Sequence, residues 1–168
     1  MGDKVTAYIG KPFSANKMYA PMKAGGMCKT RAYNAWIKLN TSKVVKQLKP
    51  IAQFPVSVQV TIMGGADWNS KTQSGHKDLD NTHKPIVDLL VKSQIIPDDS
   101  HEYIDRIQSK FMPFKHGVTQ TVIEIEIPEE ALGAWAPAGY KIDDNGLIVP
   151  ICEISVTQES SDEIRSSD

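Results

Sequence analysis

The sequence has few cysteines, few aromatic residues and no long apolar run. Its two cysteines, Cys28 and Cys152, form no CxxC pair, which excludes a disulfide framework and a zinc ribbon. No apolar run reaches the roughly 20 residues that a membrane helix needs, and the first residues lack the apolar core of a secretory signal. Aromatic residues make up only 7% of the chain, so Ile, Val, Leu and Met must build the core. We therefore expect a cytoplasmic protein that does not enter a membrane.

Acidic and basic residues nearly cancel, but they are unevenly distributed along the 168 residues. Residues 1–50 carry ten basic side chains and one acidic side chain, whereas residues 129–168 carry two basic and nine acidic ones. A basic segment of this kind suits a surface that binds phosphates. A lysine-rich helix face in solvent would give the same pattern, so charge alone leaves both interpretations open.

Hydrophobic periodicity predicts the fold class. Alternating apolar residues indicate four strands, and apolar residues at helical spacing indicate two helices between them. In chain order these six elements cover about residues 4–9, 31–49, 55–63, 80–93, 102–112 and 118–127. The order β-α-β-α-β-β predicts a single α+β domain, with helices packed on one face of a mixed sheet.

Three other segments lack this periodicity. Residues 11–30 contain four lysines, two prolines and two glycines, which is typical of a mobile basic loop. We place the main domain at residues 1–128, and a C-terminal extension at residues 129–157. The Asn145-Gly146 pair predicts a β-hairpin within that extension. The acidic, serine-rich residues 158–168 are expected to be a disordered tail.

A cluster of carboxylates is the most informative chemical feature. Asp78 and Asp80 flank Leu79, and in extended chain both side chains point to one side. Lys84 follows Asp80 by one helical turn, and Asp98 and Asp99 come after the predicted helix. Carboxylate oxygens with water in the remaining positions are the ligands that Mg²⁺ prefers. Such a metal can polarise a phosphodiester, and a nearby lysine can neutralise the developing charge.

Simpler interpretations of this cluster exist. Asp80 could be only the N-cap of the helix, with Lys84 as its i+4 partner, but this leaves the other carboxylates unexplained. An EF-hand loop fails because His83 and Leu89 stand where a glycine and a glutamate are required. A DxDxT phosphatase needs a buried strand before the motif, whereas residues 74–77 are polar. Spacing alone leaves a Mg²⁺ site and a plain helix cap as alternatives.

The segment DLDNTHKPIVDLL (residues 78–90), followed by Asp98 and Asp99, resembles the RusA family of Holliday-junction resolvases. PFSANKMY (residues 12–19) is similar to the family's early Pro-x-Ser-x-Asn loop, and the resemblance spans about residues 4–128. The resemblance implies a homodimeric, Mg²⁺-dependent endodeoxyribonuclease that resolves four-way DNA junctions by paired nicks, in recombination and repair. It also implies a bacterial host cell, with the gene carried by a phage or prophage.

Carried over by position, the resemblance assigns the catalytic aspartates that hold the metal to Asp78, Asp80 and Asp99. It assigns the catalytic lysine to Lys84, and it implies Mg²⁺ as cofactor, for which Mn²⁺ can substitute. The residue after Lys84 is Pro85, so the helix should start near Thr82, where a missing backbone donor costs little. Phosphates would be bound by basic residues of the N-terminal third: Lys23, Lys29, Arg31 and Lys38.

Two other functions keep the same residues but change their use. One is a metal-dependent nuclease that acts on other branched DNA, such as flaps or forks. The other is a junction-binding module without catalysis, although uncompensated carboxylates would oppose phosphate binding there.

Four further residues carry expectations of their own. We expect Tyr33 and Trp36 in the core, and Trp68 at the surface against DNA or a partner subunit. Asp88 is expected to pair with Lys84 or to lie in a dimer contact. The span of the predicted helix leaves open whether Asp99 completes its own site or that of the neighbouring subunit.

Overall fold

The structure is a computed structural model that describes residues 3–68, 79–114, 117–129, 133–143 and 148–151. Among these residues, no helix is both long enough and apolar enough to span a membrane. The elements are, in order, β1 (Lys4–Ile9), the 3₁₀ helix η1 (Ala15–Lys17), β2 (Tyr19–Pro21), β3 (Met27–Lys29), α1 (Arg31–Val44), β4 (Gln53–Phe54), β5 (Val56–Gly64), the 3₁₀ helix η2 (Asp80–Thr82), α2 (His83–Lys92), β6 (Ile104–Pro113), β7 (Gln120–Glu126), β8 (Gly133–Ala134), β9 (Tyr140–Ile142) and β10 (Ile148–Pro150).

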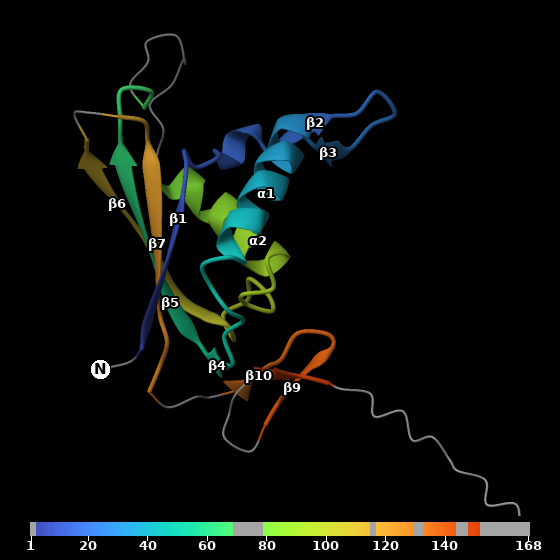
Figure 1. Cartoon of the computed structure of the whole chain (residues 1–168). Coiled ribbons are helices and arrows are strands. Elements are labelled where there is room, and N and C mark those ends of the chain that lie inside the picture. The colour runs from blue at the N-terminus through green and yellow to red at the C-terminus, as the bar shows by residue number, and fades with distance from the viewer. Residues whose placement is uncertain (1–2, 69–78, 115–116, 130–132, 144–147, 152–168) are drawn as a thin grey trace, which may run out of the picture.

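A four-stranded mixed sheet forms the centre of the fold, in the order β1-β7-β5-β6. β7 is antiparallel to both β1 and β5, whereas β5 and β6 are parallel. A parallel pair needs a crossover connection, and here α2 lies within it. Figure 1 shows α1 and α2 on the same side of this sheet. The predicted α+β class, with two helices on one face of a mixed sheet, is confirmed.

Period-two alternation explains how the sheet builds the core. The buried aliphatic residues of β5 and β7 that face the helices are β-branched: Val56, Val58, Val60, Ile62, Ile123 and Ile125. Such residues suit a pleated surface that is covered on one side. From α2, Ile86, Leu89 and Leu90 pack into the same cluster and are fully buried.

The first helix is shorter than periodicity predicted. Thr30 is its N-cap, and the Thr30 hydroxyl accepts a hydrogen bond from the backbone N–H of Tyr33 at 3.2 Å. The helix ends at Val44, before the predicted Lys49. Leu48 is buried although it lies beyond the end of the helix. The apolar pattern therefore extended further than the helix itself.

The segment predicted to be a mobile basic loop contains ordered elements, which corrects that prediction. β2 and β3 form an antiparallel hairpin, and η1 precedes it. Gly25 and Gly26 both have positive φ, at 89° and 86°, which glycine adopts without strain. Both strands are largely exposed, so no buried face gave the sequence an alternating pattern. In Figure 1 this hairpin projects away from the body, beside the start of α1.

The C-terminal extension forms two strand pairs. β9 and β10 are antiparallel, as the predicted hairpin around Asn145-Gly146 requires, although residues 144–147 themselves are outside the described part of the chain. β8 pairs with β4, and Trp135 packs against the core. The extension is therefore attached to the main sheet domain by backbone pairing. The tail predicted at 158–168 lies outside the described residues.

Candidate active site

The start of α2 places the central residues of the predicted site. Thr82 is the N-cap and His83 the first helical residue, so the helix begins where Pro85 predicted. Pro85 then lies in the first turn, where its missing N–H is not needed. Asp80 lies in η2 rather than at the N-cap of α2, which corrects the helix-cap alternative. Its Oδ1 accepts a hydrogen bond from the Asn81 backbone at 2.9 Å, and its side chain is exposed.

Lys84 and Asp99 are brought together within one chain. The Lys84 ammonium donates a short hydrogen bond to Asp99 Oδ2. The chain reverses after α2 through Gln94, whose φ is 55°, and the buried Ile95 and Ile96 anchor the return. Because α2 has only ten residues, it is about 15 Å long, which leaves the following segment enough length to return.

Asp88 is a second partner of Lys84. Its Oδ1 lies 2.9 Å from Lys84 Nζ, one helical turn further along α2. The expectation of an ion pair between these two residues is confirmed. Asp88 Oδ2 accepts a hydrogen bond from the Tyr33 hydroxyl at 2.6 Å, and Lys29 Nζ lies 3.3 Å from the same oxygen.

These contacts favour the charged forms of Lys84, Asp88 and Asp99 and the neutral form of Tyr33. The hydrogen bond to Asp99 is the largest influence on Lys84 and raises its pKa, while partial burial opposes this rise. The same bond lowers the pKa of Asp99. Burial acts to raise the pKa of Asp88, but hydrogen bonds from Tyr33 and Lys84 outweigh it and the net shift is downward. Burial, followed by the bond to Asp88, raises the pKa of Tyr33, so its hydroxyl stays protonated and donates.

Two polar contacts attach the site to the sheet. His83 Nε2 and the Ser109 hydroxyl of β6 share a hydrogen bond of 2.7 Å. The Thr82 hydroxyl, which is buried, lies 3.5 Å from the same Ser109 hydroxyl and also donates to the Leu79 carbonyl. The beginning of α2 is thus fixed to β6 directly beside Lys84.

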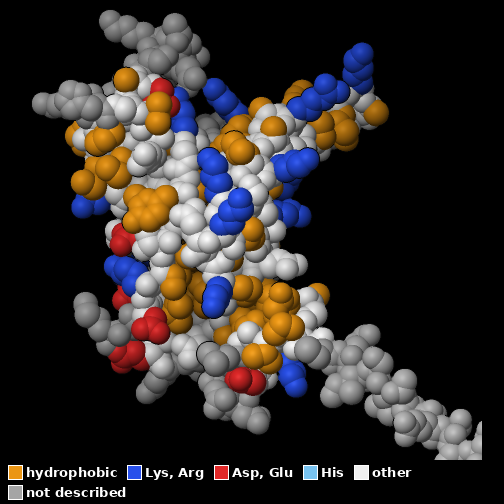
Figure 2. All heavy atoms as spheres, in the orientation of Figure 1, with side chains coloured by type: hydrophobic (Ala, Val, Ile, Leu, Met, Phe, Trp, Pro, Cys, Tyr) orange, Lys and Arg blue, Asp and Glu red, His pale blue; other side chains and the backbone are white. Residues whose placement is uncertain are grey.

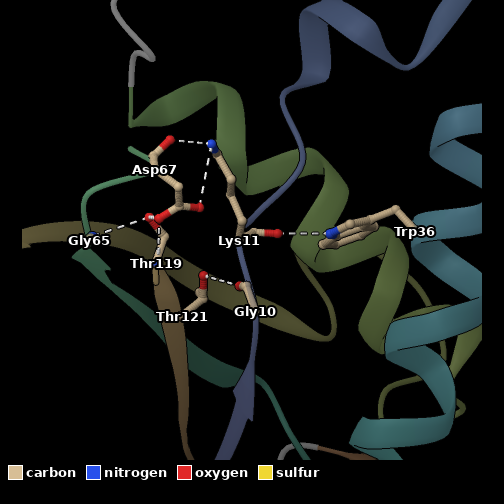
Figure 3. Close-up of polar contacts among 7 residues, drawn as sticks. All are labelled: Gly10, Lys11, Trp36, Gly65, Asp67, Thr119 and Thr121. Carbon is tan, nitrogen blue, oxygen red and sulfur yellow. Dashed lines mark hydrogen bonds and ion pairs between the residues drawn. The ribbon is translucent and has the colours of Figure 1, made fainter. Parts of the chain in front are cut away.

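A separate polar cluster holds the segment that leads toward Asp78 (Figure 3). Lys11 Nζ donates to the Asp67 backbone carbonyl and lies 3.6 Å from its carboxylate. Asp67 Oδ1 accepts from both the backbone N–H and the hydroxyl of Thr119, each at 2.6 Å. Gly65 donates to that hydroxyl, and a Cβ on Gly65 would lie 2.4 Å from the Gly117 carbonyl. These residues lie far apart in the chain, so no local sequence pattern connects them.

Asp78 itself is outside the described residues, which resume at Leu79. Among the residues that are described, no group of three His, Cys, Asp or Glu side chains is placed to hold a metal ion. Of the three aspartates that the resemblance assigned, the structure therefore describes Asp80 and Asp99. Trp68 is partly buried and packs against the core, with its ring centroid 5.5 Å from that of Phe111, and its expected contact with DNA or a partner subunit stays a prediction.

The four predicted phosphate-binding residues all lie on the hairpin and α1. Lys23 is in the exposed connection between β2 and β3, Lys29 ends β3, Arg31 begins α1, and Lys38 lies on its exposed side. On the face in Figure 2, Lys and Arg side chains follow α1 and this hairpin. Lys29 differs from the other three because its ammonium pairs with Asp88 and lies 5.1 Å from the Tyr33 ring centroid.

Comparison with known proteins identifies the family. Residues 10–127 match the family described as endodeoxyribonuclease RusA, and comparison with curated proteins gives no match. The matched region runs from the end of β1 to just past β7, so it contains the whole of α2, Asp80 and Asp99. It covers well over half of the chain. The chain belongs to the RusA family of endodeoxyribonucleases.

Proposed function

We propose that this protein is a Mg²⁺-dependent endonuclease that resolves four-way DNA junctions by paired nicks, in recombination and repair in the cytoplasm of a bacterial host. The observation that carries the proposal is the contact between Lys84 and Asp99 of one chain, at the start of the helix that Asp80 precedes. A lysine paired with one carboxylate, with a second carboxylate four residues before the lysine, suits phosphodiester chemistry. Membership of an endodeoxyribonuclease family gives this chemistry its substrate class.

The donor chemistry around Lys84 fits a magnesium ion. Asp80 and Asp99 are exposed carboxylates, and Mg²⁺ is usually bound through one or two carboxylates while it keeps several waters. Asp80, Asp88 and Asp99 together carry three negative charges, whereas Lys29 and Lys84 supply two positive ones. A bound cation would offset the excess, so that phosphate could approach.

Asp78, Asp80 and Asp99 would hold this ion. When bound, it supplies the Lewis acidity that polarises the scissile phosphate and supports the leaving oxygen. The role of Lys84 is to neutralise the charge that develops at the phosphate during cleavage. The hydrogen bond to Asp99 favours the protonated form of Lys84, which this role requires.

DNA affinity is assigned to the exposed basic surface of the hairpin and α1. Lys23, Arg31 and Lys38 have exposed side chains there. Lysines and arginines that neutralise phosphates release counterions, which gives affinity without sequence information. A homodimer would present two such surfaces and two active sites about a dyad, as a junction with two-fold symmetry requires.

The proposal is tested by incubating the full chain with a mobile four-way junction, with each strand labelled in turn. Mg²⁺, Mn²⁺ and EDTA are compared, and a flap, a fork and a linear duplex of matching sequence are the control substrates. Paired nicks at symmetric positions, with either metal and without cleavage in EDTA, are the expected result. Equal cleavage of flaps and forks would indicate a general branched-DNA nuclease, and a retarded but uncut junction would indicate a binding module.

A further inference from the structure

Asp88 lies one helical turn after Lys84 on α2, and all of its described contacts are with protein donors. Lys84 approaches Oδ1, while Tyr33 and Lys29 both approach Oδ2. Only 12% of the Asp88 side chain is exposed, compared with 42% for Asp99. Three donors occupy most of the acceptor sites of this carboxylate, and little of it faces solvent, which makes it a poor metal ligand. The Asp88 carboxylate is therefore suited to hold Lys84 rather than to bind a cofactor.

Tyr33 gives Asp88 a fixed position. The Tyr33 side chain is 1% exposed, and its ring packs edge-on against Phe13 and stacks with Trp36, at centroid distances of 5.4 and 6.4 Å. The hydrogen bond that its backbone N–H donates to the N-cap Thr30 holds its backbone at the start of α1. A phenol packed in this way has little rotamer freedom, so its hydroxyl defines where the Asp88 carboxylate lies.

Lys84 needs such an anchor because its own side chain is long and 49% exposed. An exposed lysine samples many rotamers, and holding it in one geometry costs side-chain entropy. Asp99 lies on the exposed side of the site, and in the proposed function it also binds the metal. Asp88 is the partner that can remain on Lys84 while Asp99 does so.

We infer that Asp88 is a positioning residue for the cleavage reaction: fixed by Tyr33 and assisted by Lys29, it holds the Lys84 ammonium at the phosphate. The inference rests on the proposed function, since it requires Lys84 to act on the scissile phosphate. It assigns to Tyr33 a role beyond core packing. It also connects the β2–β3 hairpin to the active site, because Lys29 is the last residue of β3.

The inference is tested by measuring cleavage of the four-way junction at saturating protein, together with the dissociation constant for the same junction. Asp88→Asn should slow single-turnover cleavage about 10-fold or more, because a displaced lysine loses its alignment with the phosphate. Junction affinity should stay within about twofold of wild type, since only 12% of the Asp88 side chain is exposed. Tyr33→Phe, which removes only the hydroxyl, should slow cleavage about threefold.

A double-mutant cycle separates this role from a purely structural one. If Tyr33 acts through Asp88, the Tyr33→Phe/Asp88→Asn variant cuts no more slowly than Asp88→Asn alone. If the two substitutions instead slow cleavage independently, so that their fold-effects multiply in the double variant, Tyr33 does not act through Asp88. An unchanged rate for Asp88→Asn, or a loss of cleavage that only follows a loss of affinity, would overturn the positioning role.

Controls distinguish failure of the inference from failure of the proposed function. If the wild-type protein does not cut the junction, the proposed function fails and the variants are not interpreted. Asp105→Asn, which changes an exposed carboxylate on β6 bonded to Ser57, is the matched control and should cut at the wild-type rate. Thermal unfolding shows which variants are folded at the assay temperature. If Asp88→Asn is not folded, the rate and affinity of Tyr33→Phe decide the question alone.

Discussion

Lys84 and Asp99 of the same chain form an ion pair, although they are separated by a helix and a chain reversal. This contact places the second aspartate of the doublet at its own subunit's helix start. We therefore predict that mixed dimers of Asp80→Asn and Asp99→Asn subunits do not nick a four-way junction, since each site lacks one carboxylate. Nicking of a single strand by a verified mixed dimer would show instead that Asp99 crosses to the neighbouring subunit. Mixed dimers of wild-type and Asp80→Asn subunits, which keep one complete site, are the positive control.

Replacement of Asp80 should separate chemistry from binding. Asp80→Asn removes a proposed metal ligand and one negative charge beside the phosphate path, while the amide oxygen can still accept the bond from Asn81. We expect cleavage to be abolished, and junction affinity to be unchanged or slightly tighter because electrostatic repulsion falls. Gel retardation in Ca²⁺ and cleavage in Mg²⁺ measure the two properties separately. Weaker binding by a folded variant would indicate that Asp80 supports the structure of the DNA surface.

If the hairpin and α1 bind DNA phosphates, removing their lysines should change how DNA affinity depends on salt. Lys23→Gln/Lys38→Gln should weaken binding of junction and duplex DNA alike, and should reduce the slope of log K against log salt by up to about two contacts at 0.9 each. Lys141→Gln on β9, which changes an exposed lysine of the C-terminal extension, is the matched control. If the double variant keeps the wild-type slope, α1 and the hairpin do not contact phosphates.

The Asp67 cluster should stabilise the fold. Asp67→Ala leaves the backbone N–H and hydroxyl of Thr119 without their acceptor, and Thr119 is 2% exposed. Buried donors that lose their partner cost about 1–3 kcal/mol in the free energy of unfolding. Urea denaturation at neutral pH measures this loss, with Asp105→Ala as a control for removing an exposed carboxylate.

The same cluster predicts a pH dependence. Hydrogen bonds from Thr119 are the largest influence on the Asp67 carboxyl, and its pKa is lowered in the folded protein. A lowered folded-state pKa contributes stability above the unfolded value of about 4, and that contribution is lost as pH falls through the folded value. The difference in unfolding free energy between wild type and Asp67→Ala should therefore be constant near neutral pH and shrink below about pH 4. A difference that stays constant down to pH 3 would contradict this assignment.

Local patterns in the sequence predicted helices and strands that bury one face, but not strands that are exposed on both faces. β1 was predicted with the bounds it has, and β5 within one residue, because one buried face imposes strict alternation. The β2–β3 hairpin has no buried face and left no such pattern. Pro85 restricted where α2 could begin, and the helix starts within one residue of that point.

The candidate site divides in the same way. The i+4 spacing of Lys84 and Asp88 can be read from the chain, and their ion pair is confirmed. The bond from Tyr33 to Asp88 joins positions 55 residues apart, so it depends on how α1 packs against α2. No local rule predicts such packing, because it depends on the whole core.

The position of β7 has a consequence for the order in which the protein can form during synthesis. β7 is the last strand of the sheet to be made, yet it lies between β1 and β5, and Lys4 is paired with Glu126. β1 can therefore pair with β7 only after nearly all of residues 10–127 have been synthesised. Thr119 and Thr121, which bond to Asp67 and Gly10, arrive with that strand (Figure 3). Strand pairing between residues so far apart in the chain is slow to nucleate. The hydrogen bonds between Asp67 and Thr119 are therefore among the last contacts of the fold to form.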